Sequence, residues 1–197
     1  MSKDKGLLVV LSSPSGGGKT TVIKRIMEEN NENYVYSISM TTRPIRDGEV
    51  HGVDYLFVSH DEFMEMIRQN LFIEYERVHD WYYGTPRGPI DKWIDDGVTV
   101  FLDLDVLGAL RLKRQFEDNV LLIFLKPPSE KVLLQRLHRR STETPSQIGK
   151  RLERVAAEMA RAAEFDVVIV NENLQKTIGQ VKKAIADKKM ALSCMEV

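Results

Sequence analysis

The chain has 197 residues, of which 43% are hydrophobic and 29% are charged, and its formal net charge is −1 at pH 7. These values predict one soluble globular domain with a sizeable core. They argue against a general nucleic-acid binder, which would carry a basic excess. The one cysteine, Cys194, has no partner for an internal disulfide, and no apolar run is long enough to span a bilayer. We therefore expect a cytoplasmic protein without a membrane segment or a signal peptide.

Short apolar runs predict the strands of a parallel sheet. Longer stretches with helical periodicity separate these runs, and this alternation is typical of βαβ units in an α/β fold. Because the runs are almost wholly apolar, we expect the strands to be buried on both faces. The runs cover residues 7–12, 98–105, 120–126 and 166–171.

Capping residues predict where the first three helices begin and end. The first helix starts in a glycine-rich loop and covers about residues 19–29. Ser59 precedes the second helix and has capping-box spacing with Glu62. The third helix has Pro86 near its first turn and Gly97 after its end, which are the usual places for proline and glycine.

Further helices are expected in the second half of the chain. One follows Asp105 and another follows Ser129, which is a plausible N-cap residue. Thr144 caps a longer helix that begins with the letters TPSQ. The last helix covers about residues 174–188.

Two segments interrupt the alternation of strands and helices. About residues 34–83 are richer in polar and aromatic side chains, and about residues 137–145 form a basic, polar connection. Insertions at the carboxyl ends of strands are where α/β proteins usually carry substrate lobes and lids. We therefore expect a lobe and a lid on the core.

A phosphate-binding motif, LLVVLSSPSGGGKTT, lies near the N-terminus. Its glycines let backbone N–H groups point inward, and the helix N-terminus adds partial positive charge, so the loop can hold phosphates. Lys19 can then reach the β- and γ-phosphates, and the Thr20 hydroxyl can bind Mg²⁺. The candidate nucleotide-binding residues are Ser13, Pro14, Ser15, Gly16, Gly17, Gly18, Lys19 and Thr20.

Ser13 departs from the usual form of this motif, which has glycine at that position. A serine there has only a small Cβ and requires no more than a negative φ. Gly16, Gly17 and Gly18 keep the positions closest to the phosphates. We therefore expect nucleotide binding to survive the change.

Asp103 and Asp105 stand at the end of a predicted buried strand, in the sequence VFLDLD. An acidic residue at this edge of a sheet can hold Mg²⁺ or its bound waters. We assign that role to Asp103 together with Thr20. The alternative is purely structural, in that Asp105 caps the next helix and Asp103 ends a turn.

Arg43 and Arg46 flank a proline in a single loop. Two guanidinium groups held close together suit an anionic group such as a phosphate monoester. The alternative is a solvated basic turn. The residues by themselves leave both interpretations open.

Taken in order and at their spacings, these motifs resemble those of the guanylate kinase family over essentially the whole chain. The matching segments are SPSGGGKT, SISMTTRPIRDGEVHGVDY, FIEY, YYGTPR, FLDLD, RLHRRSTET followed by KRL, and VIVN. The resemblance implies an α/β P-loop NTPase three-layer fold in one domain, residues 1–197. It also implies a parallel-sheet core at about residues 1–33, 86–136 and 152–197, an inserted GMP-binding lobe at about 34–85 and a small lid at about 137–151.

The resemblance implies roles for individual residues. Those that match the binding site for the GMP phosphate are Arg43, Arg46, Tyr55 and Tyr83, and those that match guanine-reading residues are Ser39, Glu74 and Thr85. Other positions of the GMP site are matched by Glu49, Gly84 and Asp105. Asn171 matches an adenine-side contact, and the arginines that close over the ATP phosphates are matched by Arg136, Arg140 and Arg151. The implied catalytic residues are Lys19, Arg43, Arg136, Arg140 and Arg151.

Glu74 illustrates how such a site would select guanine. A carboxylate can accept hydrogen bonds from both the N1–H and the 2-amino group of guanine, and adenine offers no such donor pair. Without the resemblance, Glu74 would be interpreted as an exposed strand residue. For the lid arginines, the alternative is a solvated basic face.

The implied reaction is ATP + GMP ⇌ ADP + GDP, with Mg²⁺ as cofactor and dGMP as a further substrate. Three alternatives are a non-catalytic domain of this fold that binds phosphopeptides, a kinase for another nucleoside monophosphate, and a P-loop GTPase. The last is disfavoured because the chain has no N-K-x-D motif. The partners that we expect are these small-molecule substrates and neither nucleic acid nor membrane, and a homo-oligomer is left open.

Overall fold

The computed structural model describes residues 6–14, 16–29, 33–78, 80–129, 132–133 and 155–195. Five strands form a parallel core sheet in the order β2-β7-β1-β8-β9. Their bounds are Leu7–Ser12 for β1, Tyr34–Tyr36 for β2, Thr99–Asp103 for β7, Val120–Lys126 for β8 and Val167–Val170 for β9. The four predicted strands are confirmed as members of one parallel sheet, and β2 adds a fifth at one edge.

The prediction that the strands are buried on both faces is confirmed for the centre of the sheet and is wrong for β9. β1 is buried along its whole length, and β7 and β8 are buried except at their last residues. In β9, Val168 and Val170 are 45% and 50% exposed, whereas Ile169 is buried. The reason is that β9 is an edge strand, and within the described residues α7 packs only against the face that carries Ile169.

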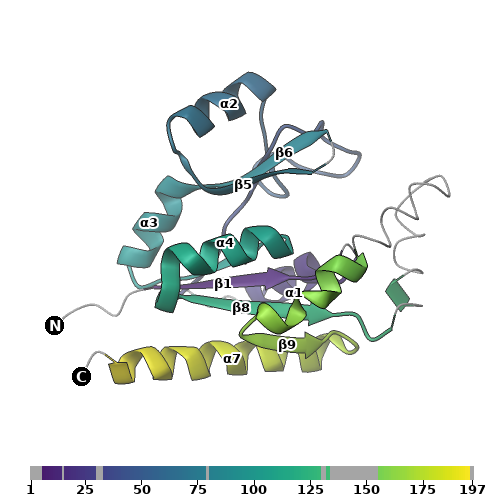
Figure 1. Ribbon diagram of the computed structural model, residues 1–197, viewed down its shortest axis with the longest axis vertical. Helices are drawn as coiled ribbons and strands as arrows, with labels where there is room; N and C mark the ends of the chain where they lie inside the picture. Colours follow the sequence, from purple (N-terminus) through teal and green to yellow (C-terminus); the bar gives the residue numbers. More distant parts are fainter. Residues whose placement is uncertain are drawn as a thin grey trace.

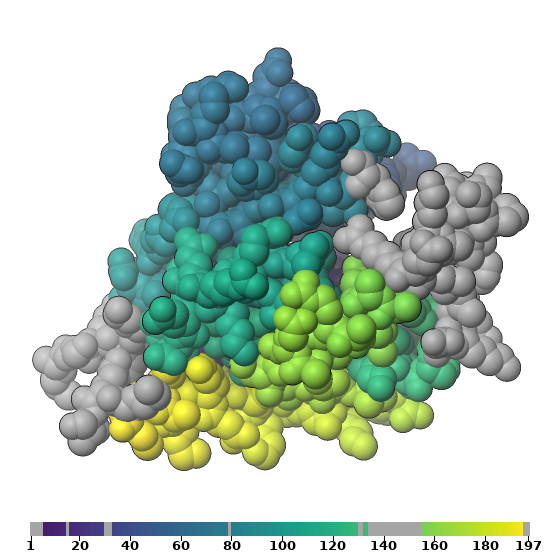
Figure 2. All heavy atoms as spheres, viewed as in Figure 1, coloured from purple at the N-terminus to yellow at the C-terminus, as the bar shows by residue number. Residues whose placement is uncertain are grey.

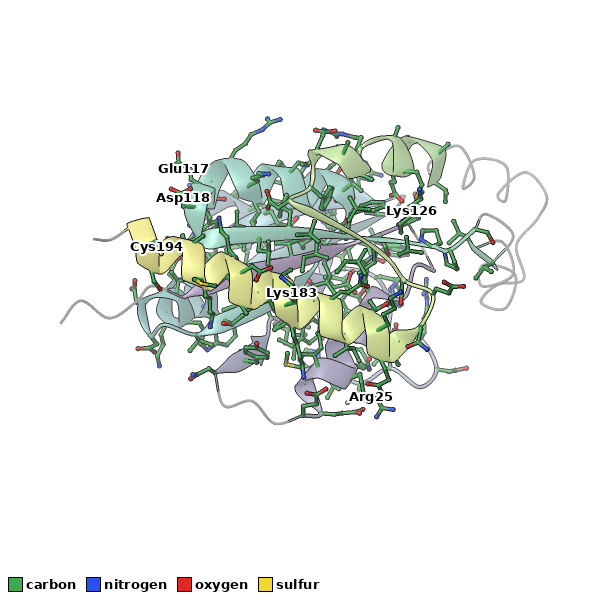
Figure 3. All side chains as sticks on the ribbon, turned by 90° about the horizontal axis from the view of Figure 1, so that it is seen from below. Arg25, Glu117, Asp118, Lys126, Lys183 and Cys194 are labelled. Carbon is green, nitrogen blue, oxygen red and sulfur yellow. The ribbon has the colours of Figure 1, made fainter. Side chains whose placement is uncertain are left out.

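Helices cover both faces of the core sheet. The described α-helices with full bounds are α1 (Lys19–Met27), α2 (His60–Arg68), α3 (Arg87–Asp95), α4 (Val106–Phe116) and α7 (Leu174–Met195). Alternate residues of β1 explain the layers, because Leu7 and Val9 pack with α1 and α7, whereas Leu8 packs with α3 and α4. Figure 1 and the view from below in Figure 3 show the resulting layers, with α7 on the outside of the sheet. The predicted three-layer α/β fold is confirmed.

Capping residues set the starts of α2 and α4 as predicted. Ser59 Oγ accepts from Glu62 N at 3.2 Å and the Glu62 carboxylate accepts from Ser59 N at 2.9 Å, which completes a capping box. Asp105 caps α4 by accepting a hydrogen bond from Gly108 N at 2.8 Å. Pro86 lies at the N-cap of α3 rather than inside its first turn. α7 continues past the predicted end near residue 188, since no glycine or proline follows that would stop it.

A second sheet is inserted between β2 and α3. Its strands are β3 (Met40–Thr41), β4 (Leu56–Phe57), β5 (Phe72–Val78) and β6 (Trp81–Pro86), in the order β4-β3-β6-β5. α2 packs on this sheet around a small core of its own, in which the rings of Phe63 and Phe72 stack with centroids 4.5 Å apart. We call this sheet with α2 the inserted unit. It projects from the core above α4 (Figure 1), and Figure 2 shows its atoms against those of α4.

Several predictions concern residues outside the described ranges. These are the lid at about residues 137–151, the residues Ser15, Arg136, Arg140 and Arg151, and the first part of the helix begun by Thr144, of which residues 155–160 are described and are helical. Of the helix expected after Ser129, residues 132–133 are described, and Val132 N donates to Ser129 Oγ at 3.2 Å, as expected for a cap. In the described part of the chain, no helix has the length and apolar character needed to cross a membrane.

Candidate active site

The phosphate loop joins the carboxyl end of β1 to α1. Gly16 and Gly18 have φ values of 82° and 94°, in the left-handed region that favours glycine, and Gly18 is the N-cap of α1. Gly17 N donates to the Pro14 carbonyl oxygen at 2.8 Å, which closes the turn. The loop thus leads directly into a helix N-terminus, where backbone N–H groups and the helix dipole favour phosphate.

Asn171 connects the phosphate loop to α7 through hydrogen bonds. Its Nδ2 donates to the Gly17 carbonyl oxygen at 2.8 Å, and its Oδ1 accepts from Thr177 Oγ1 at 3.1 Å. Both side chains are buried. Asn171 therefore links the loop to α7, and its expected contact with adenine stays a prediction.

Lys19 lies among three oxygen atoms. Its Nζ donates to the Ser13 carbonyl oxygen at 3.1 Å and to Ser13 Oγ at 3.4 Å, and it lies 3.6 Å from Asp103 Oδ1. The Ser13 side chain is buried, and its hydroxyl donates to the Pro14 carbonyl oxygen at 3.0 Å. The residue that departs from the usual motif therefore adds an oxygen acceptor beside the lysine.

Thr20 and Asp103 form the candidate Mg²⁺ site. Because β1 and β7 are parallel neighbours, their carboxyl ends meet, and Thr20 Oγ1 donates to Asp103 Oδ2 at 2.8 Å. A hydroxyl and a carboxylate are the hard oxygen ligands that Mg²⁺ prefers. No group of three or more His, Cys, Asp or Glu side chains with metal-binding geometry occurs among the described residues. The pair therefore fits an ion whose remaining ligands are waters and substrate phosphates.

Glu74 and Thr85 form a buried polar pair where the inserted unit meets α4. They are cross-strand partners in β5 and β6, and Thr85 Oγ1 donates to Glu74 Oε1 at 2.8 Å. A register shift between Phe72 and Glu74 lets Ile73 pack into the main core while Glu74 beside it is buried as well. Burial raises the pKa of Glu74 to about 7, although the bond from Thr85 and the charge of Arg111 act in the opposite direction. The alternative interpretation of Glu74 as an exposed strand residue is wrong.

Arg43 is buried and is held by Glu49. Its Nη1 and Nη2 donate to the two Glu49 carboxylate oxygens at 3.0 and 2.8 Å, and its guanidinium lies 5.5 Å from the centroid of the Tyr55 ring. The bonds from Arg43 lower the pKa of Glu49, so this carboxylate is ionised at neutral pH. Glu49 also accepts from the backbone N of Arg46 at 2.9 Å. Arg43 is therefore not part of a merely solvated basic turn.

The structure brings most of the predicted GMP-site residues into two groups on the inserted unit. The Arg43 cluster comprises Arg43, Glu49, Tyr55 and Tyr83, and the rings of Tyr55 and Tyr83 meet edge to face at 5.9 Å. The second group is the Glu74–Thr85 pair. Ser39 directly precedes Met40, whose partner in β6 is Gly84. Extending this antiparallel register by one residue places Ser39 opposite Thr85. The Arg46 side chain is exposed at the border of the Arg43 cluster.

One ion pair links the segment that carries the Arg43 cluster to the helix that follows the phosphate loop, and the pKa of Tyr55 reflects the nearness of Asp103. Lys24 of α1 and Asp54 of the inserted unit form an ion pair at 3.0 Å. Burial, together with the nearby charge of Asp103, raises the pKa of Tyr55 to about 12. The candidate Mg²⁺ site and the Arg43 cluster therefore lie within electrostatic range of each other.

Gly108 and Arg111 also surround Glu74, and the sequence motifs did not predict them. A Cβ at Gly108 would lie 3.0 Å from Glu74 Oε2 and 3.2 Å from Asp105 Oδ1. Arg111 Nη2 lies 4.0 Å from Glu74 Oε2. The signal that could have found them is the spacing of three residues from Asp105 to Gly108 to Arg111, which places all three on one side of α4. Thr177 behind Asn171 carried no comparable signal.

We expect Ser13 and Gly17 to depend on each other. A Cβ at position 17 would clash with Ser13 Oγ and would lie 2.5 Å from Ser13 Cβ. Gly17→Ala should therefore lower the melting temperature and weaken binding of an ATP analogue about tenfold or more. Ser13→Gly combined with Gly17→Ala should recover part of both, because it removes two of the three close contacts and leaves the Pro14 carbonyl oxygen 2.9 Å from the new Cβ. Equal defects in the single Gly17→Ala and the double variant, by calorimetry, would contradict this coupling.

The raised pKa of Glu74 also predicts how stability changes with pH. Since the folded-state pKa of about 7 exceeds the ordinary value of 4.5, the proton on Glu74 stabilises the fold at low pH. That stabilisation is lost as pH rises through about 7. Denaturant unfolding of the wild type and of Glu74→Gln should show the wild type gaining about 2 kcal/mol relative to the variant between pH 8 and pH 5. A pH-independent difference would mean that Glu74 titrates normally.

Comparison with known proteins agrees with this geometry. The family model described as "Guanylate kinase" matches residues 5–188. The guanylate kinase of Chlorobaculum tepidum is 46% identical over 187 residues, which cover 93% of this chain and 94% of the relative. That of Sulfurimonas denitrificans is 43% identical over 95% of this chain and 90% of the relative.

Solved structures give the same result. The crystal structure of guanylate kinase from Anaplasma phagocytophilum superposes with a TM-score of 0.78 at 33% identity, covering 95% of this chain and 88% of that chain. A gluconokinase from Sinorhizobium meliloti, at 17% identity and a TM-score of 0.52 over 99% of each chain, shares the fold alone. The matched family model, the sequence identities and the superposition agree over nearly the full length. The chain belongs to the guanylate kinase family.

Proposed function

We propose that this guanylate kinase transfers the γ-phosphoryl group of ATP to GMP, and also to dGMP, by direct in-line attack of a phosphate oxygen of the nucleoside monophosphate. The observation that supports this proposal is that one chain carries two separate groups of residues suited to binding a nucleotide. A phosphate loop with Lys19 lies at the end of β1, and a buried Glu74–Thr85 pair lies on the inserted unit. A kinase of this kind needs no nucleophilic side chain, so catalysis consists of positioning and charge stabilisation.

In this proposal the phosphate loop and Lys19 bind the β- and γ-phosphates of ATP. This role of Lys19 is supported by its contacts with the oxygens of Ser13 and Asp103, which place the ammonium group beside the phosphate loop. Thr20 and Asp103 would hold Mg²⁺, partly through water. When bound, the ion supplies positive charge to the phosphate oxygens. Asn171 keeps the loop in shape through the Gly17 carbonyl oxygen.

The Arg43 cluster would receive the phosphate of GMP. Glu49 and the Pro44 carbonyl oxygen hold the Arg43 guanidinium beside Tyr55 and Tyr83, and an incoming phosphate would take over some of these hydrogen bonds. The exposed Arg46 guanidinium would complete the site. Because the cluster lies within electrostatic range of Asp103, the attacking oxygen would be held near the γ-phosphate of ATP.

Glu74 would select the base of the nucleoside monophosphate through hydrogen bonds. Its buried carboxylate accepts one hydrogen bond from Thr85, and two further donors, the N1–H and 2-amino group of guanine, would satisfy it. An adenine base would present an acceptor at N1 and leave the buried carboxylate without those donors, which costs enough to discriminate strongly. Ser39, which precedes β3, and Asp105, the N-cap residue of α4, would border the same position. These arguments support guanine over other bases.

We also propose a division into core, GMP-binding lobe and lid. The lobe corresponds to the inserted unit at about residues 34–85, although Tyr34–Tyr36 itself belongs to the core sheet as β2. The core comprises about residues 1–33, 86–136 and 152–197, and the lid about residues 137–151. Movement of the lobe against the core would exclude water and so limit hydrolysis of ATP.

The substrate panel is the direct test of this function. Purified protein is incubated with ATP, Mg²⁺ and one of GMP, dGMP, AMP, UMP or CMP, and the diphosphate product is measured. We expect GMP to give the highest kcat/KM, dGMP to be used as well, and AMP to be at least about 1,000-fold poorer. A preference for AMP or a pyrimidine would refute the guanine assignment. Absence of any diphosphate product would favour a non-catalytic binding domain.

Lys19→Ala separates catalysis from binding of GMP. We expect kcat to fall at least about 100-fold, because the lysine charge no longer stabilises the transferring phosphoryl group. Calorimetric affinity for GMP should stay within about twofold of the wild type, since Lys19 lies outside the Arg43 cluster. Lys183→Ala is the matched control, because Lys183 is exposed on α7, on the far side of the sheet from the inserted unit (Figures 1 and 3). Joint loss of turnover and GMP binding would mean that Lys19 acts through the fold.

A further inference from the structure

Arg111 connects two carboxylates of β5. Its Nη2 donates to Glu76 Oε2 at 2.6 Å and to the Tyr75 carbonyl oxygen at 3.2 Å, and it lies 4.0 Å from Glu74 Oε2. The Arg111 side chain is 43% exposed, whereas that of Glu74 is 6% exposed. One cation at the surface therefore acts on a buried carboxylate and on a more accessible one at the same time.

α4 approaches Glu74 very closely at its first turn. A Cβ at Gly108 would lie 3.0 Å from Glu74 Oε2, so the carboxylate lies directly against the helix backbone. The partial positive charge of a helix N-terminus favours an anion there. Arg111 follows Gly108 by three residues and so extends over the same carboxylate from the next turn.

The charged groups that act on Glu74 come from α4 and β5. Asp105 of α4 and Glu76 of β5 raise its pKa and Arg111 lowers it, while β6 contributes the Thr85 hydroxyl, which also lowers it. Burial has the largest effect and raises the pKa to about 7. Among the described charged groups that act on Glu74, Arg111 is the cation that opposes burial and the two anions.

We propose that Arg111 is a positioning residue for guanine recognition, which acts through its charge to keep the Glu74 carboxylate ready to accept from the base and does not touch the substrate. This inference rests on the proposed function, in which Glu74 accepts from the N1–H and the 2-amino group. A protonated Glu74 loses one acceptor and cannot match two donors. Glu76 moderates the effect, because it holds the guanidinium at 2.6 Å and thereby keeps it farther from Glu74.

Substitutions at the two partners should shift GMP binding in opposite directions. Arg111→Ala should raise the Kd for GMP about two- to fivefold at pH 7, the result of a further rise of half to one unit in the pKa of Glu74. Glu76→Gln should lower the Kd at pH 6, since it removes an anion and releases Arg111 toward Glu74. Arg111→Lys keeps a positive charge and should restore most of the wild-type affinity.

The experiment is calorimetric titration of each full-length variant with GMP, without ATP, from pH 6 to pH 9. The GMP phosphate also titrates, with a second pKa of about 6, but equally for every variant, so only ratios of Kd at the same pH are compared. Arg114→Ala is the matched control, because Arg114 is exposed on α4 and acts on Glu164. Thermal unfolding of each variant checks that the fold is intact.

We expect the Kd ratio of Arg111→Ala to wild type to be largest near pH 6–7 and to approach one at pH 9, where Glu74 is ionised in both proteins. The Arg114→Ala ratio should stay near one throughout. A ratio for Arg111→Ala that is the same at every pH, whether one or larger, would overturn the inference, because a structural or direct role does not depend on the ionisation of Glu74. If Glu74→Gln binds GMP as tightly as the wild type at pH 9, the proposed role of Glu74 fails, and the inference fails with it.

Discussion

The burial of the Glu74 carboxylate between the inserted unit and α4 is the constraint on which the proposed base site depends. The register shift in β5 sends Ile73 into the main core and brings Glu74 to the same boundary. A carboxylate without enough hydrogen bonds is costly in such a place, and Thr85 and the first turn of α4 offset only part of the cost. The Glu74 carboxylate, where the inserted unit meets the core, would therefore be stabilised most by a ligand that donates two hydrogen bonds to it.

The phosphate-binding side depends on a different constraint, the common end of parallel strands. β1 and β7 finish side by side, which brings Thr20 and Asp103 within 2.8 Å and places Lys19 beside both Ser13 and Asp103. The ion pair between Lys24 and Asp54 then ties the inserted unit to α1. In the proposed function the core would hold the donor phosphates and the inserted unit the acceptor, an arrangement suited to in-line transfer.

Much of this arrangement was predictable from the sequence, where the signal is local. Continuous apolar runs revealed the central strands, and the Ser59–Glu62 spacing revealed the start of α2. The two-residue strands β3 and β4 are too short to show the alternation of apolar and polar side chains that indicates a strand. Residues 34–36, which form β2, were predicted to belong to the lobe. The exposed face of β9 and the contact of Arg111 with β5 depend on tertiary packing, which spacing along the chain does not reveal. Glu74 was identified by family resemblance, whereas its burial and raised pKa emerged only from the fold.

The most direct test of guanine recognition is a titration of the Glu74 side chain itself, by NMR of its carboxyl carbon, with the signal assigned by its loss in Glu74→Gln. In the free protein the midpoint should lie near the pKa of about 7 that burial produces. Saturation with GMP should lower that midpoint by more than about one unit, because the base donates to the ionised form. A free-protein midpoint near the ordinary value of 4.5, or a midpoint unchanged by GMP, would contradict the role given to this buried carboxylate.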